Sequence, residues 1–128
     1  MNIFDQFDNG KLFLVGKEEI DFASNDWLPH AKFEGVISKP LISGKDTDNV
    51  FSYQLVRIEP NMKIGLHAHD TQLETHEVVA GHGVCLFDGK EVEYVPGNIG
   101  VMPIGVEHEI IAGDEGLCIL AKFIPAYR

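Results

Sequence analysis

The sequence is poor in cysteines, in basic residues and in long apolar runs, and each shortage excludes a class of protein. Its two cysteines, Cys85 and Cys118, cannot build the disulfide framework of a small secreted domain, and they stand in apolar segments that predict buried thiols. Ten basic residues against twenty acidic ones give a net charge of −10, which opposes binding to nucleic acid or to an anionic membrane. No apolar run approaches the roughly 20 residues of a membrane-spanning helix.

The first residues also lack the features of an export signal. The segment from Met1 to Asp5 carries acid where a secretory signal has basic residues. Together with the cysteine content, this predicts a cytoplasmic protein in a reducing compartment. At 128 residues, the chain is long enough for one domain with a substantial core, so we expect a single domain over 1–128.

After residue 50 the sequence lacks helical periodicity, and short strand-like segments separated by turns take its place. Residues 51–58 read FSYQLVRI, which is rich in the aromatic and β-branched residues that strands favour. An Asp88-Gly89 pair between two such segments is a strong hairpin signal. Strands are expected at 51–58, 84–87, 91–95, 99–102, 108–112 and 117–124. Closely spaced strands predict an all-β sandwich or barrel over 51–124, with a helix content below about 15%.

The first 50 residues are less regular but apolar enough to pack against the rest. Segments 35–38 and 40–42 are expected to be edge strands. The strand expected at 117–124 carries apolar side chains on both faces, so both faces should be covered. We therefore expect residues 1–50 to cover the barrel or to form an interface with a second subunit, and we predict a homodimer.

Three histidines and a glutamate stand at spacings that suit a divalent metal ion. His67 and His69 are two positions apart, so on a strand their side chains point to the same face. Glu74 follows after enough residues for a tight turn, and His108 begins another expected strand. Imidazole and carboxylate groups are ligands that iron, zinc, manganese and nickel all accept. On their own, the paired histidines are equally compatible with ordinary surface or core positions.

The residues around this group resemble the two sequence motifs of the cupin family. The first motif places a glutamate and a glycine after H-x-H, and the segment HAHDTQLETHEVVAG from His67 to Gly81 matches it. The second motif is matched by Gly97, Pro103, Gly105 and His108. Asn61 replaces the leading glycine of the first motif, and Ala112 replaces the final asparagine of the second. Because asparagine tolerates a positive φ, we expect Asn61 to form the same turn.

This resemblance is close over residues 60–112, and it implies a fold, a ligand set and a function. The implied fold is the double-stranded β-helix, or jelly-roll barrel, of the cupins. The implied ligands of one divalent metal ion are His67, His69, Glu74 and His108. An open site of this kind implies a small-molecule metalloenzyme of the oxygenase, sugar isomerase or lyase type. The alternatives are a cupin that binds or senses a small ligand without turnover, and a structural protein with a vestigial site.

Proton transfer at such a site requires a base that is not itself a metal ligand. His76 lies two positions after Glu74 and should face the same way, so it is one candidate, although a hydrogen-bonded core histidine fits the pattern equally well. Tyr53 is the other candidate, and it shares the parity of Arg57. Gln54 has the opposite parity, so only one of these two sets can face the cavity.

Two further polar residues are expected outside the site. Glu77 has the opposite parity to Glu74, so it should face solvent. His82 follows Gly81, which reads as a turn residue, so it is expected in a surface loop.

Overall fold

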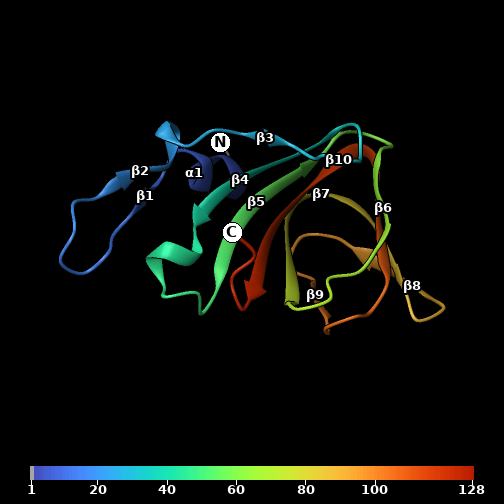
Figure 1. Cartoon of the computed structure of the whole chain (residues 1–128). Coiled ribbons are helices and arrows are strands. Elements are labelled where there is room, and N and C mark those ends of the chain that lie inside the picture. Colours follow the sequence, from blue (N-terminus) through green and yellow to red (C-terminus); the bar gives the residue numbers. More distant parts are fainter. Residues whose placement is uncertain (1) are drawn as a thin grey trace.

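The computed structural model describes residues 2–128, and strands dominate it (Figure 1). Strands account for 52% of the chain and helices for 9%, which confirms the all-β expectation and its low helix content. The helical segments are α1 (Ile3–Asp8), η1 (Phe22–Ser24) and η2 (Gly44–Asp46). The strands are β1 (Lys11–Leu12), β2 (Ile20–Asp21), β3 (Leu28–Pro29), β4 (Val36–Ile42), β5 (Ser52–Ile58), β6 (Lys63–His67), β7 (Leu73–Phe87), β8 (Lys90–Tyr94), β9 (Ile99–Met102) and β10 (His108–Ile124). Within the described chain, no helix has the length and apolar character needed to cross a bilayer.

Two long strands, β7 and β10, pair with each other and organise the barrel. The antiparallel strand order is β3-β4-β5-β10-β7-β8, with β6 added to β10 and β9 added to β7. The C-terminal half of β10 pairs with β5, while its N-terminal half pairs with β6. The first half of β7 pairs with β9, and its second half pairs with β8. The two long strands therefore pass from one sheet into the other and build the jelly-roll barrel of Figure 1.

The strands expected at 108–112 and 117–124 are one continuous strand, so the prediction of a turn between them was wrong. The chain stays extended there, and its register against β7 shifts between Ala112 and Leu117. Gly81 and Gly116 both have positive φ at this shift, and a side chain on Gly81 would collide with the backbone of Gly116. The glycines therefore permit an irregularity that bends both long strands, whereas a turn would have reversed the chain.

Two turn predictions are confirmed by the backbone angles. Asp88 and Gly89 have φ values of 51° and 71°, the pair of positive angles that a tight hairpin requires, and they join β7 to β8. Asn61 has a φ of 62°, so asparagine does occupy the left-handed turn position that the resemblance predicted for it.

Apolar side chains form one core inside the barrel and a second core on the outer face of the β5–β10 sheet. The inner core includes Val36, Val56, Ile58, Ile64, Val78, Ile110, Ile119 and Phe123. The outer core consists of Phe4, Phe22, Leu41, Leu55 and Leu120, with Trp27 and Tyr53 packed against it. Both apolar faces of β10 are thus covered within one chain, because α1, η1 and Trp27 supply the outer cover. This removes the observation from which a homodimer was predicted, and the dimer stays a prediction.

Candidate metal centre

The four side chains predicted as ligands come together between the two sheets. Their ligand atoms all lie within 4.8 Å of one another. His67 ends β6 and His108 begins β10, and the two residues are direct partners in the strand pairing. Glu74 lies near the start of β7. The expectation that His69 stands on the same strand as His67 was wrong, because β6 ends at His67 and the following turn places the second imidazole.

Backbone carbonyls decide which ring nitrogen of two of these histidines faces the centre. Nδ1 of His67 lies 2.8 Å from the carbonyl oxygen of Gly65, and Nδ1 of His108 lies 3.0 Å from that of Val106. A carbonyl oxygen only accepts a hydrogen bond, so each Nδ1 carries the proton. Nε2 of both rings therefore presents a lone pair to the centre, which is the orientation that a metal ligand needs.

The Nε2 atom of His108 shows that these residues fit a cation. It is buried without a hydrogen-bond partner, and it lies 3.2 Å from Oε1 of Glu74, which also lacks one. With Nδ1 donating to Val106, a neutral His108 has no proton on Nε2 to give to the carboxylate. Two buried acceptors that face each other in this way are stabilised only when a proton or a cation lies with them. A divalent metal ion satisfies both acceptors at once.

Burial and neighbouring charges set the ionisation states in the cluster. Burial alone would raise the pKa of the Glu74 carboxyl, but His76, His108 and His69 together hold it well below its usual range. Burial also lowers the pKa of His67 and of His69. Near neutral pH the cluster therefore offers one carboxylate together with neutral imidazoles at His67 and His69, groups that suit a borderline divalent metal.

Of the two candidate bases, the structure brings His76 to the cluster and places Tyr53 elsewhere. Nε2 of His76 lies 3.1 Å from Oε1 of Glu74, and only 1% of the residue is exposed. Tyr53 packs against the outer core, and its hydroxyl lies 3.2 Å from Oε2 of Glu77. The prediction that Tyr53 serves the site does not fit this position. Gln54, its neighbour of opposite parity, lines the cavity instead, because the apolar outer core holds Tyr53 on the other face.

The cluster opens into a narrow cavity of about 60 Å³. Its walls are mainly apolar, and they are formed by Val36, Val56, Ile64, Ile110, Ile119 and Phe123. Polar side chains reach it from His30, Ser38, Gln54, Tyr127 and Arg128. Sequence reasoning gave no role to His30 and did not single out Tyr127 or Arg128. No sequence motif includes these residues. His30 reaches the cavity from the N-terminal segment, whereas Tyr127 and Arg128 reach it from the C-terminus, so only tertiary packing brings them together.

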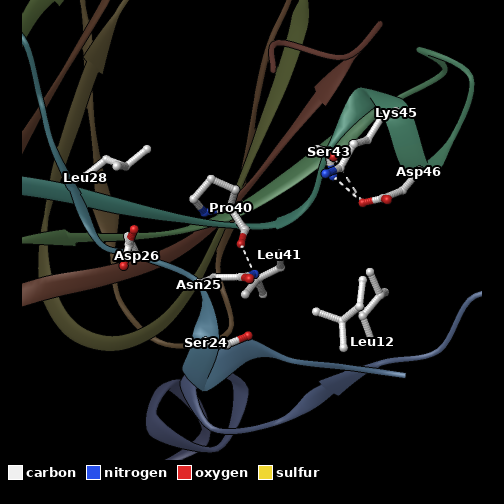
Figure 2. Close-up of a pocket in the computed structure, with 11 residues that line it drawn as sticks. Leu12, Ser24, Asn25, Asp26, Leu28, Pro40, Leu41, Ser43, Lys45 and Asp46 are labelled. Atoms are coloured by element: carbon white, nitrogen blue, oxygen red, sulfur yellow. Dashed lines mark hydrogen bonds between the residues drawn. The ribbon is translucent and has the colours of Figure 1, made fainter. Parts of the chain in front are cut away.

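A larger cavity of about 410 Å³ lies outside the barrel, against the N-terminal segment (Figure 2). Figure 2 shows polar side chains there that are already engaged: Asn25 donates to the carbonyl oxygen of Pro40, and Asp46 accepts from Ser43. No histidine or cysteine is among its lining residues. The side chains that could hold a metal ion therefore line the smaller cavity, although the larger one offers more space.

His82 and Glu77 both lie away from the cluster. The expectation of a loop at His82 was wrong, because this residue lies within β7, where Nε2 is 2.8 Å from Oδ1 of the exposed Asp114. Glu77 does occupy the face opposite Glu74, but it is half-buried, with Oε1 3.7 Å from Nζ of Lys122. The prediction that Glu77 faces solvent holds for its direction but missed the partial cover from Tyr53 and Lys122.

Comparisons with known proteins agree with this architecture. The family model described as a cupin domain matches residues 54–121. A predicted oxalate decarboxylase from Thermotoga maritima is 25% identical, with a TM-score of 0.71, over 79% of this chain and 91% of that one. A sugar phosphate isomerase from Silicibacter pomeroyi is 24% identical, with a TM-score of 0.70, over 84% of this chain and 75% of that one.

A third solved structure, a polyketide cyclase from Streptomyces resistomycificus, is 18% identical, with a TM-score of 0.73, over 85% of this chain and 79% of that one. No curated protein matches the sequence. At these identities the isomerase and the cyclase show a shared fold, and they leave the reaction open.

Proposed function

This chain belongs to the cupin family, and from that membership and the geometry of the cluster we propose that it is a metal-dependent enzyme that acts on a small molecule. One observation carries the proposal: the ligand atoms of His67, His69, Glu74 and His108 converge within 4.8 Å. Those residues would hold one divalent ion of iron, zinc, manganese or nickel. When bound, such an ion supplies Lewis-acid polarisation of a substrate oxygen.

The cavity favours a small substrate that carries an anionic group. Glu74 is the acidic residue in the lining, and the charge of a bound divalent metal ion would exceed that of its carboxylate. The guanidinium of Arg128 then leaves the cavity with an excess of positive charge. The cavity is narrow, at about 60 Å³, which favours a small substrate or the reactive end of a larger one. The likeness to a predicted oxalate decarboxylase supports a small acid of this kind.

The protein residues around the cluster would bind, orient and shield the substrate. Gln54 and Arg128 supply donors for a carboxylate, while Ile119 and Phe123 exclude bulk water. Water exclusion strengthens every charge interaction within the cavity. His76 is the titratable group at the cluster outside the proposed ligand set, so it is the candidate to hold or move a proton.

The second candidate function is a cupin that binds or senses a small ligand without turnover. Nδ1 of His76 lies 2.7 Å from the hydroxyl of Tyr94, and only 1% of the residue is exposed, so the imidazole has little freedom to reach a substrate, and this favours a site that has no free base. The vestigial structural protein is disfavoured, because the whole ligand set is present and converges.

Metal analysis followed by a substrate panel tests the proposal. We expect close to one divalent ion per chain by mass spectrometry of the purified protein. Iron would favour an oxygenase, whereas zinc or manganese would favour an isomerase or a lyase. The panel pairs small carboxylic acids with their amides, and we expect turnover of acids only. Metal binding with saturable ligand binding but no turnover would establish the sensing function instead, and protein without metal would contradict both.

A cytoplasmic location and a homodimer remain our proposals for the setting of this enzyme. Both cysteines are free, and the thiol of Cys85 is fully buried, which supports a reducing compartment. In the connection between β1 and β2, Phe13 and Val15 lie exposed, a feature that supports contact with a second copy. Light scattering at tens of micromolar should report a dimer, and a monomeric mass would contradict the assembly but leave the site intact.

A further inference from the structure

We propose that His30 and Arg128 form an anion-binding pair at the mouth of the narrow cavity, and that this pair selects a substrate with a carboxylate at one end and a second oxygen-bearing group at the other. The pair would bind the carboxylate, and the second group would reach the metal centre. The inference deepens the proposed function and rests on it for the metal-binding end. The pair consists of donors of the chain itself, so it can be tested without metal.

Both residues lie at the exposed end of the cavity that holds the ligand cluster. Their side chains line the same cavity as Glu74 and His76. Glu74 and His76 are buried, whereas His30 and Arg128 are exposed, so the latter two lie where a ligand enters. Partial burial lowers the pKa of His30, and the positive charge of Arg128 lowers it further, which places the two side chains near each other.

Backbone groups fix the imidazole of His30. Its Nδ1 accepts hydrogen bonds from the backbone N–H groups of Lys32 and Phe33, at 3.0 and 3.2 Å. An N–H group can only donate, so Nδ1 carries no proton and the proton of the neutral ring lies on Nε2. The backbone N–H of His30 donates to the carbonyl oxygen of Val36 and holds the residue in its turn. The ring therefore offers a donor, Nε2–H, on its side away from these amides.

Phe33 anchors this turn to the barrel. Its ring packs against the inner core, and its centroid lies 4.8 Å from that of the His30 ring. Gly65 on β6 leaves the necessary space, because a Cβ there would collide with the ring of Phe33. The imidazole of His30 is thus held in place without a ligand, which lowers the entropic cost of binding one.

The last residues of the chain hold Arg128 at the same mouth. The backbone N–H of Tyr127 donates to Oγ of Ser52 at 2.8 Å. The carbonyl oxygen of Arg128 accepts from the backbone N–H of Gly44. The guanidinium carbon lies 5.7 Å from the centroid of the Tyr127 ring, within the range of a cation–π contact. Within residues 2–128, no carboxylate forms an ion pair with Arg128, so its charge is available to a ligand.

A carboxylate matches this pair of donors. A guanidinium offers two parallel N–H donors to the two oxygens of a carboxylate, and the imidazole N–H supplies a third. Glu74 is the acidic residue in the lining, and it lies at the buried end among imidazoles, away from these donors. An uncharged amide of the same shape presents one acceptor oxygen and no charge. The pair should therefore select acids over amides.

The direct test uses malonate, which carries a carboxylate at each end, and malonamide as its uncharged counterpart. Nitrogen-15 NMR follows the side chains of His30 and Arg128 in the full chain at pH 7.5 and constant ionic strength, first without metal. We expect malonate to shift both side chains saturably and malonamide to shift neither. Added Zn²⁺ should raise the affinity for malonate by about tenfold or more, because the second carboxylate reaches the ion. Malonate that shifts neither residue would overturn the inference.

Two variants with matched controls separate the pair from a general effect of charge. His30→Phe keeps an aromatic ring against Phe33 but removes the N–H, and Arg128→Gln removes the charge. Each should weaken malonate binding about tenfold and reduce the preference for malonate over malonamide. His82→Phe at the surface and Lys45→Gln beside the larger cavity should bind malonate as the wild type does. Equal weakening in Lys45→Gln and Arg128→Gln would show that net charge alone acts, and that there is no selective pair.

The metal proposal and this inference can fail separately. If malonate shifts His30 and Arg128 but Zn²⁺ does not bind, the metal site is wrong and the anion-binding pair stands. If Zn²⁺ binds and malonate then binds without shifting His30 or Arg128, the metal site stands and the pair is wrong. Wild-type protein supplies both readings even where a variant does not fold.

Discussion

Strand β7 carries one glutamate on each face of the sheet, and the two carboxylates are balanced by different partners. Glu74 points into the barrel and is 6% exposed, and within the described chain the basic groups within 4 Å of its carboxylate are all imidazoles. Glu77 points outward to the hydroxyl of Tyr53 and the ammonium of Lys122. Identical side chains three positions apart therefore have different chemistry. Outside, a lysine and solvent balance the charge, whereas inside the charge needs a bound cation or a protonated imidazole.

Removing the inner imidazoles should have the largest effect on metal binding, which distinguishes the inner face of β7 from the outer face. We expect a triple variant, His67→Ala with His69→Ala and His108→Ala, to lose its metal completely, because one carboxylate cannot hold a divalent ion against a chelator. The measurement is metal content after dialysis against a chelator and reloading. His82→Ala is the matched control, since its imidazole pairs with Asp114 at the surface. Full metal content in the triple variant would remove both the site and the enzyme proposal.

Replacing each carboxylate by an amide, one at a time, compares the inner and outer faces of β7 directly. Glu74→Gln removes the negative ligand, so we expect metal affinity to fall roughly ten- to a hundredfold and the preference among metals to change. Glu77→Gln removes the same charge from the outer face and should leave both unchanged. Competition titrations with zinc and manganese would measure this, and equal effects of the two variants would show that the face does not matter.

Acid should weaken the inner site before it affects the outer face. Because burial lowers the pKa of His67 and of His69, they stay neutral above the ordinary imidazole value of about 6.5. The unfolded chain binds protons more readily there, so these residues stabilise the metal-free fold above that value, and the contribution is lost as the pH falls. Zn²⁺ affinity should fall over the same range, because bound imidazoles must be neutral. Titrations and urea unfolding from pH 7.5 to 5 test this, and affinity that rises in acid would contradict it.

The smallest effect is expected from the outer ion pair. Lys122 and Glu77 lie 3.7 Å apart, and both side chains are partly exposed. Pairs of this kind contribute about 0 to 1 kcal/mol, since water competes for both charges. Lys122→Met should therefore change the free energy of unfolding by less than about 1 kcal/mol and leave metal binding as it is. A larger loss in chemical denaturation would mean that the outer face is more tightly coupled to the barrel than its exposure indicates.

Sequence by itself determined the family, the β-rich fold and the group of residues that converges. H-x-H, the following glutamate and the later histidine are short-range patterns with fixed spacing, and the cupin resemblance placed them in one cluster. The hairpin turn at Asp88-Gly89 and the positive φ at Asn61 were also predicted from the sequence, because the conformation of a turn depends on its own few residues. Such local signals survive without knowledge of the fold.

Other features were decided only by the tertiary structure. Period-two alternation shows that Tyr53 and Gln54 point to opposite faces, but only the packing of Phe4 and Leu55 shows which face is outside. Glycines at 81 and 116 read as turns until the pairing of β7 with β10 shows that they lie within long strands. The contact of Tyr94 with His76 joins residues 18 positions apart on different strands. A side chain's role depends on which distant groups share its low-dielectric surroundings, and chain spacing does not contain that information.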